Sequence, residues 1–254
     1  MEYGCCQVSV APIRLETSDR SEMVSQLLFG ELFEIISKKG NWIEIKTIFD
    51  SYCGFIDYKH QLPVSNEEFE ILKNEVSYSK NVVDYMKWND QLFPISIGSE
   101  LRNFNNHKVD HFRQTYTFDG DILHGKLSKS ELMNIAFQFL NVPYLWGGKS
   151  SFGIDCSGFT QQVYKLAGYS LPRDASQQAE VGEVLSFIEE AENGDMAFFE
   201  NDEGKIIHVG LVFDGNKIIH AHGKVRIDTL DYTGIYNSEY NKHTHILRFI
   251  RRLF

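Results

Sequence analysis

The chain has 254 residues, of which 43% are hydrophobic and 24% charged, enough to bury a sizeable core and to form two or three domains. Its formal net charge of −10 and the lack of a long basic run argue against nucleic acid or an anionic membrane surface as partners. No apolar stretch approaches the ~18 residues that span a bilayer, which argues against a membrane segment.

The N-terminal residues 1–6 contain neither the basic n-region nor the apolar h-region of a signal peptide, so we expect a cytoplasmic protein. A leader removed during processing would overturn this expectation. The four cysteines are Cys5, Cys6, Cys53 and Cys156. Because two of them are adjacent and the expected compartment is reducing, they make a poor disulfide framework.

Short strands separated by glycine-containing turns are predicted in the first quarter of the chain. Their ranges are 7–10, 22–28, 32–37, 42–47 and 54–57. This pattern is typical of a small β-barrel, and residues 1–62 resemble a bacterial SH3-like domain through the segments 21–31, 41–45 and 52–56. Such a barrel either binds a ligand or only stabilises the chain, because a fold alone does not define a function.

Residues 63–126 give a weaker pattern. Residues 64–69 predict the capped start of a short helix, and residues 110–124 alternate enough to predict a hairpin around residues 119–121. Three histidines of this region are interpreted as surface residues: His107, His111 and His124.

A longer helix is predicted after Leu127. Ser128 and Glu131 have the spacing of a capping box. The apolar residues that follow recur on one helix face: Leu132, Ile135, Ala136, Phe139 and Leu140. We therefore expect this face to pack inward.

Cys156 lies at the predicted start of a second helix. The glycine-rich segment 143–153 precedes it, and apolar residues follow at the spacing of one helix face: Phe159, Val163 and Leu166. The unpaired N–H groups and the positive dipole end at a helix start stabilise a thiolate, and a favourable site lowers a thiol pKa from about 8.5 to ~3.5–7.5. Cys156 is therefore either an activated nucleophile or a small buried apolar residue, the usual fate of a cytoplasmic cysteine.

A strand hairpin in the last quarter of the chain carries three histidines. The predicted strands of this region are 194–200, 206–213, 217–222 and 244–251. Helices followed by an antiparallel sheet predict an α+β domain, in which the helix of Cys156 packs on the sheet that carries the histidines. His243 and His245 are assigned no role.

The length of the hairpin turn decides which histidines meet. With a three-residue turn, His208 opposes His222 and has His220 as its same-face diagonal neighbour. With a two-residue turn, His208 and His220 lie on opposite faces. Gly215 and Asn216 tolerate positive φ and favour the longer turn. We therefore expect all three histidines to converge behind the cysteine.

Together these motifs resemble the catalytic domain of the NlpC/p60 family of papain-like cysteine peptidases. The matching words are Pro-Tyr-Leu-Trp-Gly-Gly at 143–148, Asp-Cys-Ser-Gly-Phe at 155–159 and His-Val-Gly at 208–210. The resemblance implies an NlpC-type peptidase domain over residues 127–254, with helices packed on an antiparallel sheet. It also implies that residues 63–126 form a second, degenerate SH3-like region.

The resemblance also implies catalytic roles. It implies that Cys156 is the nucleophile and His208 the base. It also implies that His220 orients the base and that Tyr144 lies on the oxyanion side of the site. The reaction is thiolate attack on an amide, formation of an acyl-enzyme and its hydrolysis. The polar segment 171–178 corresponds to the family's substrate side.

Family members with two SH3-like units before the peptidase resemble γ-D-glutamyl-L-diamino acid endopeptidases. These cut murein peptides with a free N-terminal L-alanine at the bond between D-glutamate and diaminopimelate or lysine, in peptide recycling. The implied binding residues are Glu22 and Tyr52 for the alanine ammonium, and Asp155, Ser157 and Ser176 for the D-glutamyl part. The alternatives are an amidase or endopeptidase acting on intact peptidoglycan, and a murein-peptide binding protein with a spent active site.

One cysteine and several histidines can also bind zinc. The chain lacks a compact Cys-x-x-Cys or His-Glu-x-x-His spacing, so we expect neither a metal nor another cofactor. The oligomeric state leaves no mark on the sequence.

Overall fold

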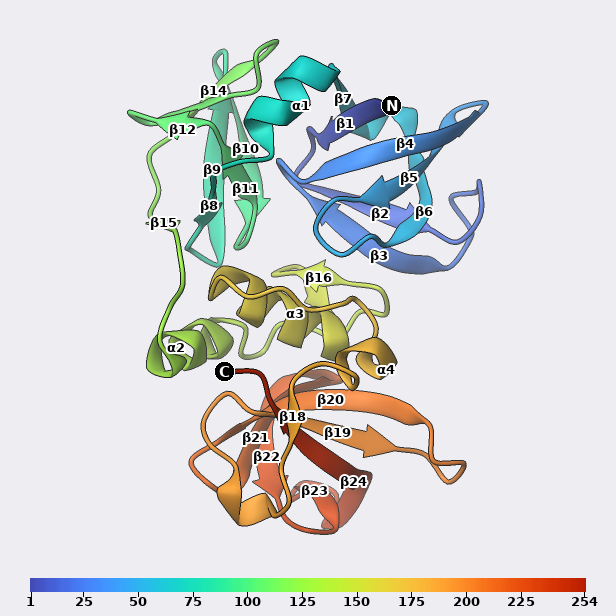
Figure 1. Ribbon diagram of the computed structural model, residues 1–254, viewed down its shortest axis with the longest axis vertical. Coiled ribbons are helices and arrows are strands. Elements are labelled where there is room, and N and C mark those ends of the chain that lie inside the picture. Colours follow the sequence, from blue (N-terminus) through green and yellow to red (C-terminus); the bar gives the residue numbers. More distant parts are fainter. The chain divides into compact units, whose positions relative to one another are not determined.

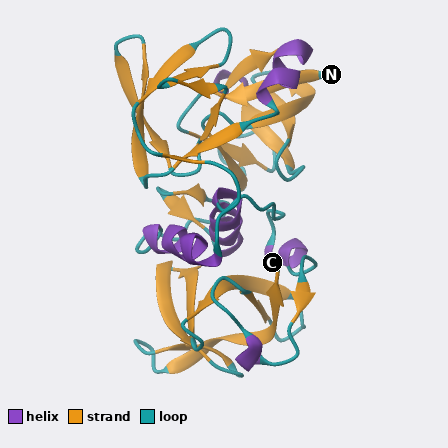
Figure 2. Cartoon of the chain, turned by 60° about the vertical axis from the view of Figure 1, so that its left-hand side comes forward, coloured by secondary structure: helices purple, strands orange, loops and turns teal.

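The computed structural model describes residues 1–254 and divides into two compact units (Figure 1). The first unit comprises Met1–Gly125 and Trp146–Phe152, and the second comprises Lys126–Leu145 and Gly153–Phe254. Strands outnumber helices in both units (Figure 2). None of the helices combines the length and the hydropathy that a membrane-spanning helix needs.

The first part of the first unit is a seven-stranded antiparallel sheet in the order β3-β2-β6-β5-β4-β1-β7. Its strands are β1 (Glu2–Cys6), β2 (Val10–Arg14), β3 (Met23–Leu28), β4 (Leu32–Lys39), β5 (Trp42–Thr47), β6 (Cys53–Asp57) and β7 (Gln61–Val64), with the short helix η1 (Tyr58–His60) before β7. Apolar side chains from these strands form one buried cluster: Cys6, Ala11, Ile13, Leu27, Phe33, Ile43, Ile45 and Ile56.

Four of the five strands predicted here are confirmed to within two residues, but the strand at 7–10 is wrong. Residues 7–9 connect β1 to β2, and the backbone N–H of Phe29 bonds to the carbonyl of Ser9 at 3.3 Å. Gly4 and Pro12 obscured the real strands on either side, because both residue types are rare inside strands.

The second part of the first unit holds one helix and two further sheets. Helix α1 (Asn66–Leu72) begins after Ser65, which forms a capping box with Glu68, as predicted. The five-stranded sheet has the order β10-β9-β14-β13-β12, and the three-stranded sheet has the order β11-β8-β15. The strands are β8 (Val76–Ser79), β9 (Val83–Trp88), β10 (Gln91–Ser96), β11 (Glu100–Arg102), β12 (Phe104–Asn105), β13 (Lys108–Asp110), β14 (Thr115–Phe118) and β15 (Ile122–Leu123), and β16 (Lys149–Ser150) also belongs to this unit.

The hairpin predicted over residues 110–124 is wrong. Strand β14 pairs with β13 and β9, whereas β15 pairs with β8 in the other sheet. Residues 119–121 therefore carry the chain from one sheet to the next, and the backbone N–H of Lys80 bonds to the carbonyl of Asp121 at 3.0 Å. A turn between two sheets has the same local composition as a turn within one hairpin.

His107 and His124 are exposed, which confirms their interpretation as surface residues, but the interpretation of His111 is wrong. The side chain of His111 is 2% exposed, and its ring lies parallel to that of Phe29 with centroids 5.6 Å apart. Its backbone N–H bonds to the carbonyl of Gln114 in a turn that directs the ring into the apolar cluster of Phe29 and Tyr116.

The second unit packs its helices against a seven-stranded antiparallel sheet in the order β18-β24-β19-β20-β21-β22-β23, in which β23 also pairs with β24. Its elements are α2 (Lys129–Gln138), β17 (Gly153–Ile154), α3 (Cys156–Leu166), α4 (Ala175–Gln178), β18 (Glu183–Val184), η2 (Ile188–Glu190), β19 (Met196–Glu200), β20 (Ile206–Phe213), β21 (Lys217–His222), β22 (Lys224–Leu230), β23 (Gly234–Asn237) and β24 (Lys242–Arg252). Helix α3 contacts α2, β20 and β21, and all of its residues are buried. The capping box of Ser128 and Glu131 at the start of α2 is confirmed.

The hairpin of β20 and β21 has the three-residue turn that the sequence favours. Leu211 pairs with Ile219 and Phe213 pairs with Lys217, which leaves residues 214–216 as the turn. The residues with positive φ are Asp214 and Gly215, rather than Gly215 and Asn216. The register that places the histidines on one face is therefore confirmed.

Candidate active site

Helix α3 begins at Cys156, as predicted. Asp155 caps this helix, because its Oδ1 accepts the backbone N–H of Gly158 at 2.7 Å. Cys156 is 8% exposed, and the backbone N–H of Val209 lies close enough to its sulfur to lower the pKa of the thiol. Since Val209 follows His208 on β20, the sulfur lies against the strand that carries the predicted base.

The Cys156 thiol is protonated at neutral pH. Burial and, to a smaller extent, the Asp155 carboxylate raise its pKa to about 12, against a smaller lowering by backbone N–H groups and the Arg173 guanidinium. The lowering that a helix start favours does not prevail in this pKa, because burial outweighs the stabilisation that a helix start gives to a thiolate. A sulfur nucleophile here must form by transfer of the thiol proton to a base.

The predicted base and its predicted partner are joined directly. Nε2 of His208 lies 2.8 Å from Nδ1 of His220, and Nε2 of His220 lies 3.0 Å from Oδ2 of Asp228. All three residues are buried. We call His208, His220 and Asp228 the hydrogen-bonded relay. The ring of His222 lies nearly parallel to that of His220 with centroids 6.1 Å apart, and no hydrogen bond joins it to the relay.

His208 is a neutral imidazole at neutral pH. Burial lowers its pKa well below the usual value, and the neighbouring rings of His220, His245 and His222 lower it further. A neutral imidazole beside a neutral thiol can accept the thiol proton as the sulfur attacks a carbonyl carbon. This arrangement is that of a general base and its nucleophile.

Tyr144 is half-buried in the same unit as the cysteine. Its backbone N–H donates to the carbonyl of Gly223 at 2.9 Å, and Tyr144 forms an isolated parallel β-bridge with Ile154. Burial, with smaller contributions from the neighbouring Cys156 and Asp155, raises the pKa of the Tyr144 hydroxyl to about 12. The hydroxyl therefore keeps its proton and can donate a hydrogen bond.

Two predicted binding residues, Asp155 and Ser157, belong to a buried network around Arg173. The Arg173 guanidinium donates to both carboxylate oxygens of Asp155, at 2.9 and 2.6 Å, and to Ser157 Oγ at 3.0 Å. Arg173 is 1% exposed. This bidentate pair fixes the residues that flank the nucleophile.

The third residue predicted for the D-glutamyl part, Ser176, is exposed on α4. The α4 residue that reaches the nucleophile helix is Gln178, whose Nε2 donates to the carbonyl of Ser157 at 2.9 Å and whose Oε1 accepts from Thr160 at 2.6 Å. The structure thus brings Asp155 and Ser157 together and leaves Ser176 outside their network.

The two residues predicted to bind an ammonium both lie in the first unit. Glu22 is exposed, and its Oε1 accepts a hydrogen bond from the indole Nε1–H of Trp146 at 2.7 Å. Tyr52 is half-buried, and its backbone N–H bonds to Oγ1 of Thr47 at 2.8 Å.

Two residues around the histidine pair, Asp228 and His245, lie outside the site that the sequence predicts. Asp228 lies on β22, whose alternating residues 224–230 carry the signal of a strand. His220 pairs with Arg226 across β21 and β22, so Asp228 lies diagonally opposite on the same face. His245 comes from β24, and its ring stacks on that of His208 with centroids 4.2 Å apart and an interplanar angle of 25°.

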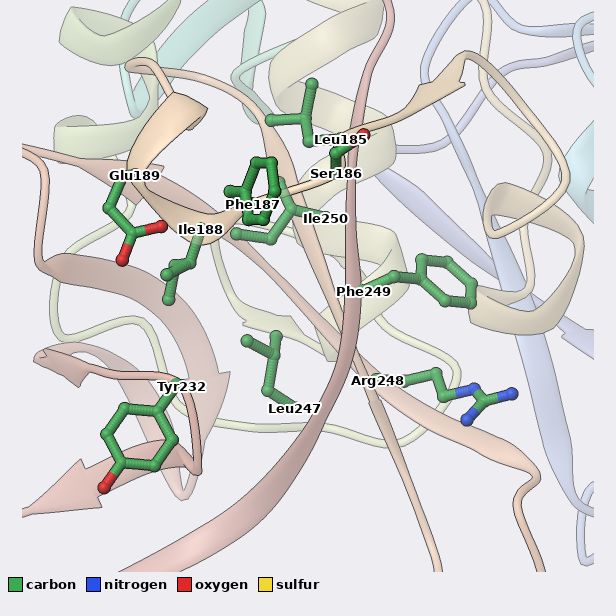
Figure 3. Close-up of a pocket in the computed structure, with 10 residues that line it drawn as sticks. All are labelled: Leu185, Ser186, Phe187, Ile188, Glu189, Tyr232, Leu247, Arg248, Phe249 and Ile250. Atoms are coloured by element: carbon green, nitrogen blue, oxygen red, sulfur yellow. The ribbon is translucent and has the colours of Figure 1, made fainter.

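A cavity of about 360 Å³ in the second unit is lined by other residues, which Figure 3 shows. They are Leu185, Ser186, Phe187, Ile188, Glu189, Tyr232, Leu247, Arg248, Phe249 and Ile250. None of them is a candidate site residue, so the assignment of the site depends on its chemistry. No group of His, Cys, Asp or Glu side chains in the chain has the arrangement of a metal site.

Comparison with known proteins agrees with this chemistry. Residues 141–248 match the NlpC/P60 family, and residues 14–60 match the bacterial dipeptidyl-peptidase SH3 domain. A Bacillus subtilis protein named gamma-D-glutamyl-L-lysine dipeptidyl-peptidase is 48% identical over 239 residues, which cover 85% of this chain and 78% of that protein. A Bacillus cereus protein of the same name is 29% identical over 259 residues, which cover 89% of this chain and 76% of that protein.

Solved structures share the fold along nearly the whole chain. The crystal structure of an NlpC/P60 family protein from Bacillus cereus has a TM-score of 0.82 at 21% identity and covers 99% of each chain. An NlpC/P60 endopeptidase from Photobacterium damselae has a TM-score of 0.74 at 15% identity and covers 97% of this chain and 70% of its own. With its papain-like domain preceded by a bacterial SH3 domain, and with a buried thiol on a helix that packs against the strands of a histidine pair, this chain belongs to the NlpC/P60 family of cysteine peptidases.

Proposed function

We propose that this protein hydrolyses the γ-D-glutamyl-L-diamino acid bond of murein peptides that carry a free N-terminal L-alanine. The observation that carries the proposal is the buried thiol of Cys156 at a helix start, against the strand of a base that is hydrogen-bonded to His220 at 2.8 Å. The choice of bond is supported by the 48% identity to a protein named gamma-D-glutamyl-L-lysine dipeptidyl-peptidase.

In the proposed reaction, His208 takes the proton of the Cys156 thiol while the sulfur attacks the γ-carbonyl carbon of D-glutamate. The tetrahedral intermediate collapses, the C–N bond breaks, and the leaving amine of the diamino acid takes the proton from His208. Water then attacks the thioester with His208 again as base, and the Cys156 thiol is restored as the dipeptide leaves. The protonated hydroxyl of Tyr144 is suited to donate to the oxyanion of each intermediate.

For the substrate, we propose that Glu22 and Tyr52 bind the alanine ammonium, and that Asp155, Ser157 and Ser176 face the D-glutamyl part. The exposed carboxylate of Glu22 supports the first assignment, because an ammonium needs an anionic partner. The buried network of Arg173 supports the second, because it holds two of these residues on either side of the nucleophile.

We further propose a cytoplasmic location, a role in recycling murein peptides, and a second SH3-like region at residues 63–126. All four cysteines are free, which suits a reducing compartment. Cell fractionation with an antibody to the protein tests the location. Recovery from a cell-surface fraction would contradict it.

The function is tested by incubating the protein with L-Ala-γ-D-Glu-diaminopimelate, and with the lysine analogue, while following release of L-Ala-D-Glu by mass spectrometry. Cys156→Ala serves as the control for a contaminating peptidase. We expect the dipeptide from the unmodified protein alone. Failure to release it from either peptide would contradict the proposed reaction.

Selectivity is tested with the N-acetylated peptide. Acetylation removes the ammonium and leaves its protein partners unpaired, so we expect kcat/KM to fall at least ~100-fold. Glu22→Ala or Tyr52→Ala should remove most of this preference. Equal cleavage of free and acetylated peptides by the unmodified protein would instead favour intact peptidoglycan as the substrate.

A further inference from the structure

The relay ends in the buried carboxylate of Asp228. Asp228 accepts a hydrogen bond from Nε2 of His220 at 3.0 Å. Arg226 donates to the same carboxylate from Nε, at 2.8 Å to Oδ2, and from Nη2, at 3.0 Å to Oδ1. Glu239 accepts from Nη1 of Arg226 at 3.0 Å, so the arginine is itself held in place.

These contacts fix the protons of both imidazoles. Arg226 is donor-only, and an ionised carboxylate is acceptor-only, so the nitrogen of His220 that faces Asp228 must carry a proton. In a neutral imidazole the other nitrogen, Nδ1, is then an acceptor. Because Nδ1 of His220 faces Nε2 of His208 at 2.8 Å, Nε2 of His208 must be the donor.

The proton on Nε2 leaves Nδ1 of His208 as its one basic nitrogen. That is the nitrogen available to the Cys156 thiol. With the opposite tautomer of His220, Nδ1 would be a donor, Nε2 of His208 would have to accept, and Nδ1 of His208 would carry a proton. The base would then have no lone pair for the thiol.

We propose that Asp228 is a positioning residue that sets the tautomer of His220 and, through it, the tautomer of His208. The proposal deepens the proposed function and rests on it for the identity of the reaction. When His208 accepts the thiol proton on Nδ1, the positive charge that forms is stabilised through His220 by the carboxylate. No proton passes along the relay to Asp228.

The charges around the relay agree with this role. Although burial raises the pKa of Asp228, the hydrogen bonds from His220 and Arg226 outweigh burial and lower it below its usual value, so the carboxylate is ionised at neutral pH. The other titratable groups that face the two imidazoles are His222 on β21 and His245 on β24. Asp228 is the anionic group in direct contact with the histidine pair, through Nε2 of His220.

The first test measures the tautomers in the unmodified protein. Two-dimensional ¹⁵N–¹H spectra of protein with ¹⁵N-labelled histidine, near pH 7, distinguish an imidazole protonated on Nε2 from one protonated on Nδ1. We expect His208 and His220 both to be protonated on Nε2. Finding His220 protonated on Nδ1 would overturn the proposal, and this measurement needs neither a substrate nor a folded variant.

The second test uses Asp228→Asn, which removes the charge, and Asp228→Ala, which also removes the acceptor. We expect kcat to fall about 10²-fold for Asn and more for Ala, with KM changed less than threefold, because the carboxylate acts on the base and not on the substrate. The acid limb of kcat/KM should move to lower pH, because loss of a neighbouring anion lowers the pKa of an imidazolium. An unchanged kcat and acid limb in Asp228→Ala would overturn the proposal.

The matched control is Asp231→Asn. Asp231 accepts from Nε2 of His243 at 2.9 Å, so the unit contains a second aspartate–histidine pair outside the relay. We expect this variant to keep the unmodified kcat and acid limb. If no murein peptide is cleaved while the spectra show both Nε2–H tautomers, the proposed function fails and the role of Asp228 in setting them stands.

Discussion

The first unit contains a cysteine–histidine pair that matches the pair at the candidate site in burial and in protonation. Sγ of Cys5 lies 3.8 Å from Nδ1 of His111. Burial raises the pKa of Cys5 to about 12 and lowers that of His111 to about 4. Burial likewise raises the pKa of Cys156 to about 12 and lowers that of His208 well below its usual value. Both pairs are therefore neutral at neutral pH.

The two pairs differ in what lies beyond the imidazole. Nε2 of His111 is buried without a hydrogen-bond partner, and the ring packs against both Phe29 and Tyr116. A proton on His111 would place a charge in an apolar cluster, which is costly. His208 instead continues through His220 to a carboxylate, so a charge formed on it is stabilised.

The cysteines also differ in their position in the fold. Cys5 lies within strand β1, whereas Cys156 is the first residue of α3. The comparison indicates that burial and pKa alone do not distinguish a catalytic thiol from a packed one. The distinction comes from the hydrogen bonds behind the base and from the helix start that presents the thiol.

The largest expected effect separates the two cysteines. Cys156→Ala removes the nucleophile, so we expect turnover of the murein peptide to fall by ~10⁴-fold or more, whereas Cys5→Ala should leave kcat/KM within threefold. Steady-state release of L-Ala-D-Glu measures both. A comparable loss of activity in the two variants would remove the distinction that the comparison draws.

The next effect concerns the histidines. His208→Ala should lower kcat by ~10³-fold, because a general base contributes about 10²–10⁴-fold to the reaction rate. His220→Ala should lower kcat by less, because His220 acts through the base. His222→Ala should lower kcat less than threefold, because His222 lies outside the relay. His111→Phe, which keeps the aromatic packing in the first unit, should also lower kcat less than threefold. If His222→Ala proves more damaging than His220→Ala, the relay is wrongly assigned.

A third effect is the pH dependence of alkylation. Iodoacetamide reacts with the thiolate, so the raised pKa of Cys5 and of Cys156 should make both react at least ~10-fold more slowly than the exposed Cys53 near pH 7, with rates that rise as pH increases. Peptide mapping after timed labelling measures each cysteine separately. Fastest labelling of Cys156 near pH 6 would show that the helix start prevails over burial.

Local signals in the sequence were sufficient for much of the candidate site. The apolar spacing after Cys156 and the turn around Gly215 are properties of a few neighbouring residues, and together they predicted the helix start and the shared face of the histidines. The pairing of bacterial SH3 and peptidase domains also followed from short motifs.

Features that depend on distant strands could not be predicted in this way. His111 is buried because Phe29, far from it in sequence, lies against its ring, and His245 reaches His208 from β24. The pKa of Cys156 depends on burial by the whole unit rather than on its helix alone. Asp228 lies between these two cases. The alternation of buried and exposed residues along β22 is a local signal, but the alignment of Asp228 with His220 depends on the register of β21 and β22.

The smallest expected effect compares the two ring stacks. His208 stacks on His245 with centroids 4.2 Å apart, and His111 stacks on Phe29 with centroids 5.6 Å apart. Burial lowers the pKa of His245 to about 3, so the ring that stacks on the base is neutral at neutral pH and its replacement by phenylalanine removes no charge. An aromatic pair contributes about 0.5–1.5 kcal/mol beyond area burial, which corresponds to a ~2- to 10-fold change in rate if the stack orients the base.

We therefore expect His245→Ala to lower kcat by that factor and His245→Phe to restore most of it. Phe29→Leu, the matching change in the first unit, should lower the unfolding free energy and leave kcat unchanged, as measured by denaturant titration and peptide turnover. If His245→Phe is as slow as His245→Ala, the contribution of His245 is polar, through its 2.9 Å contact with Thr244 Oγ1, and the stack does not orient the base.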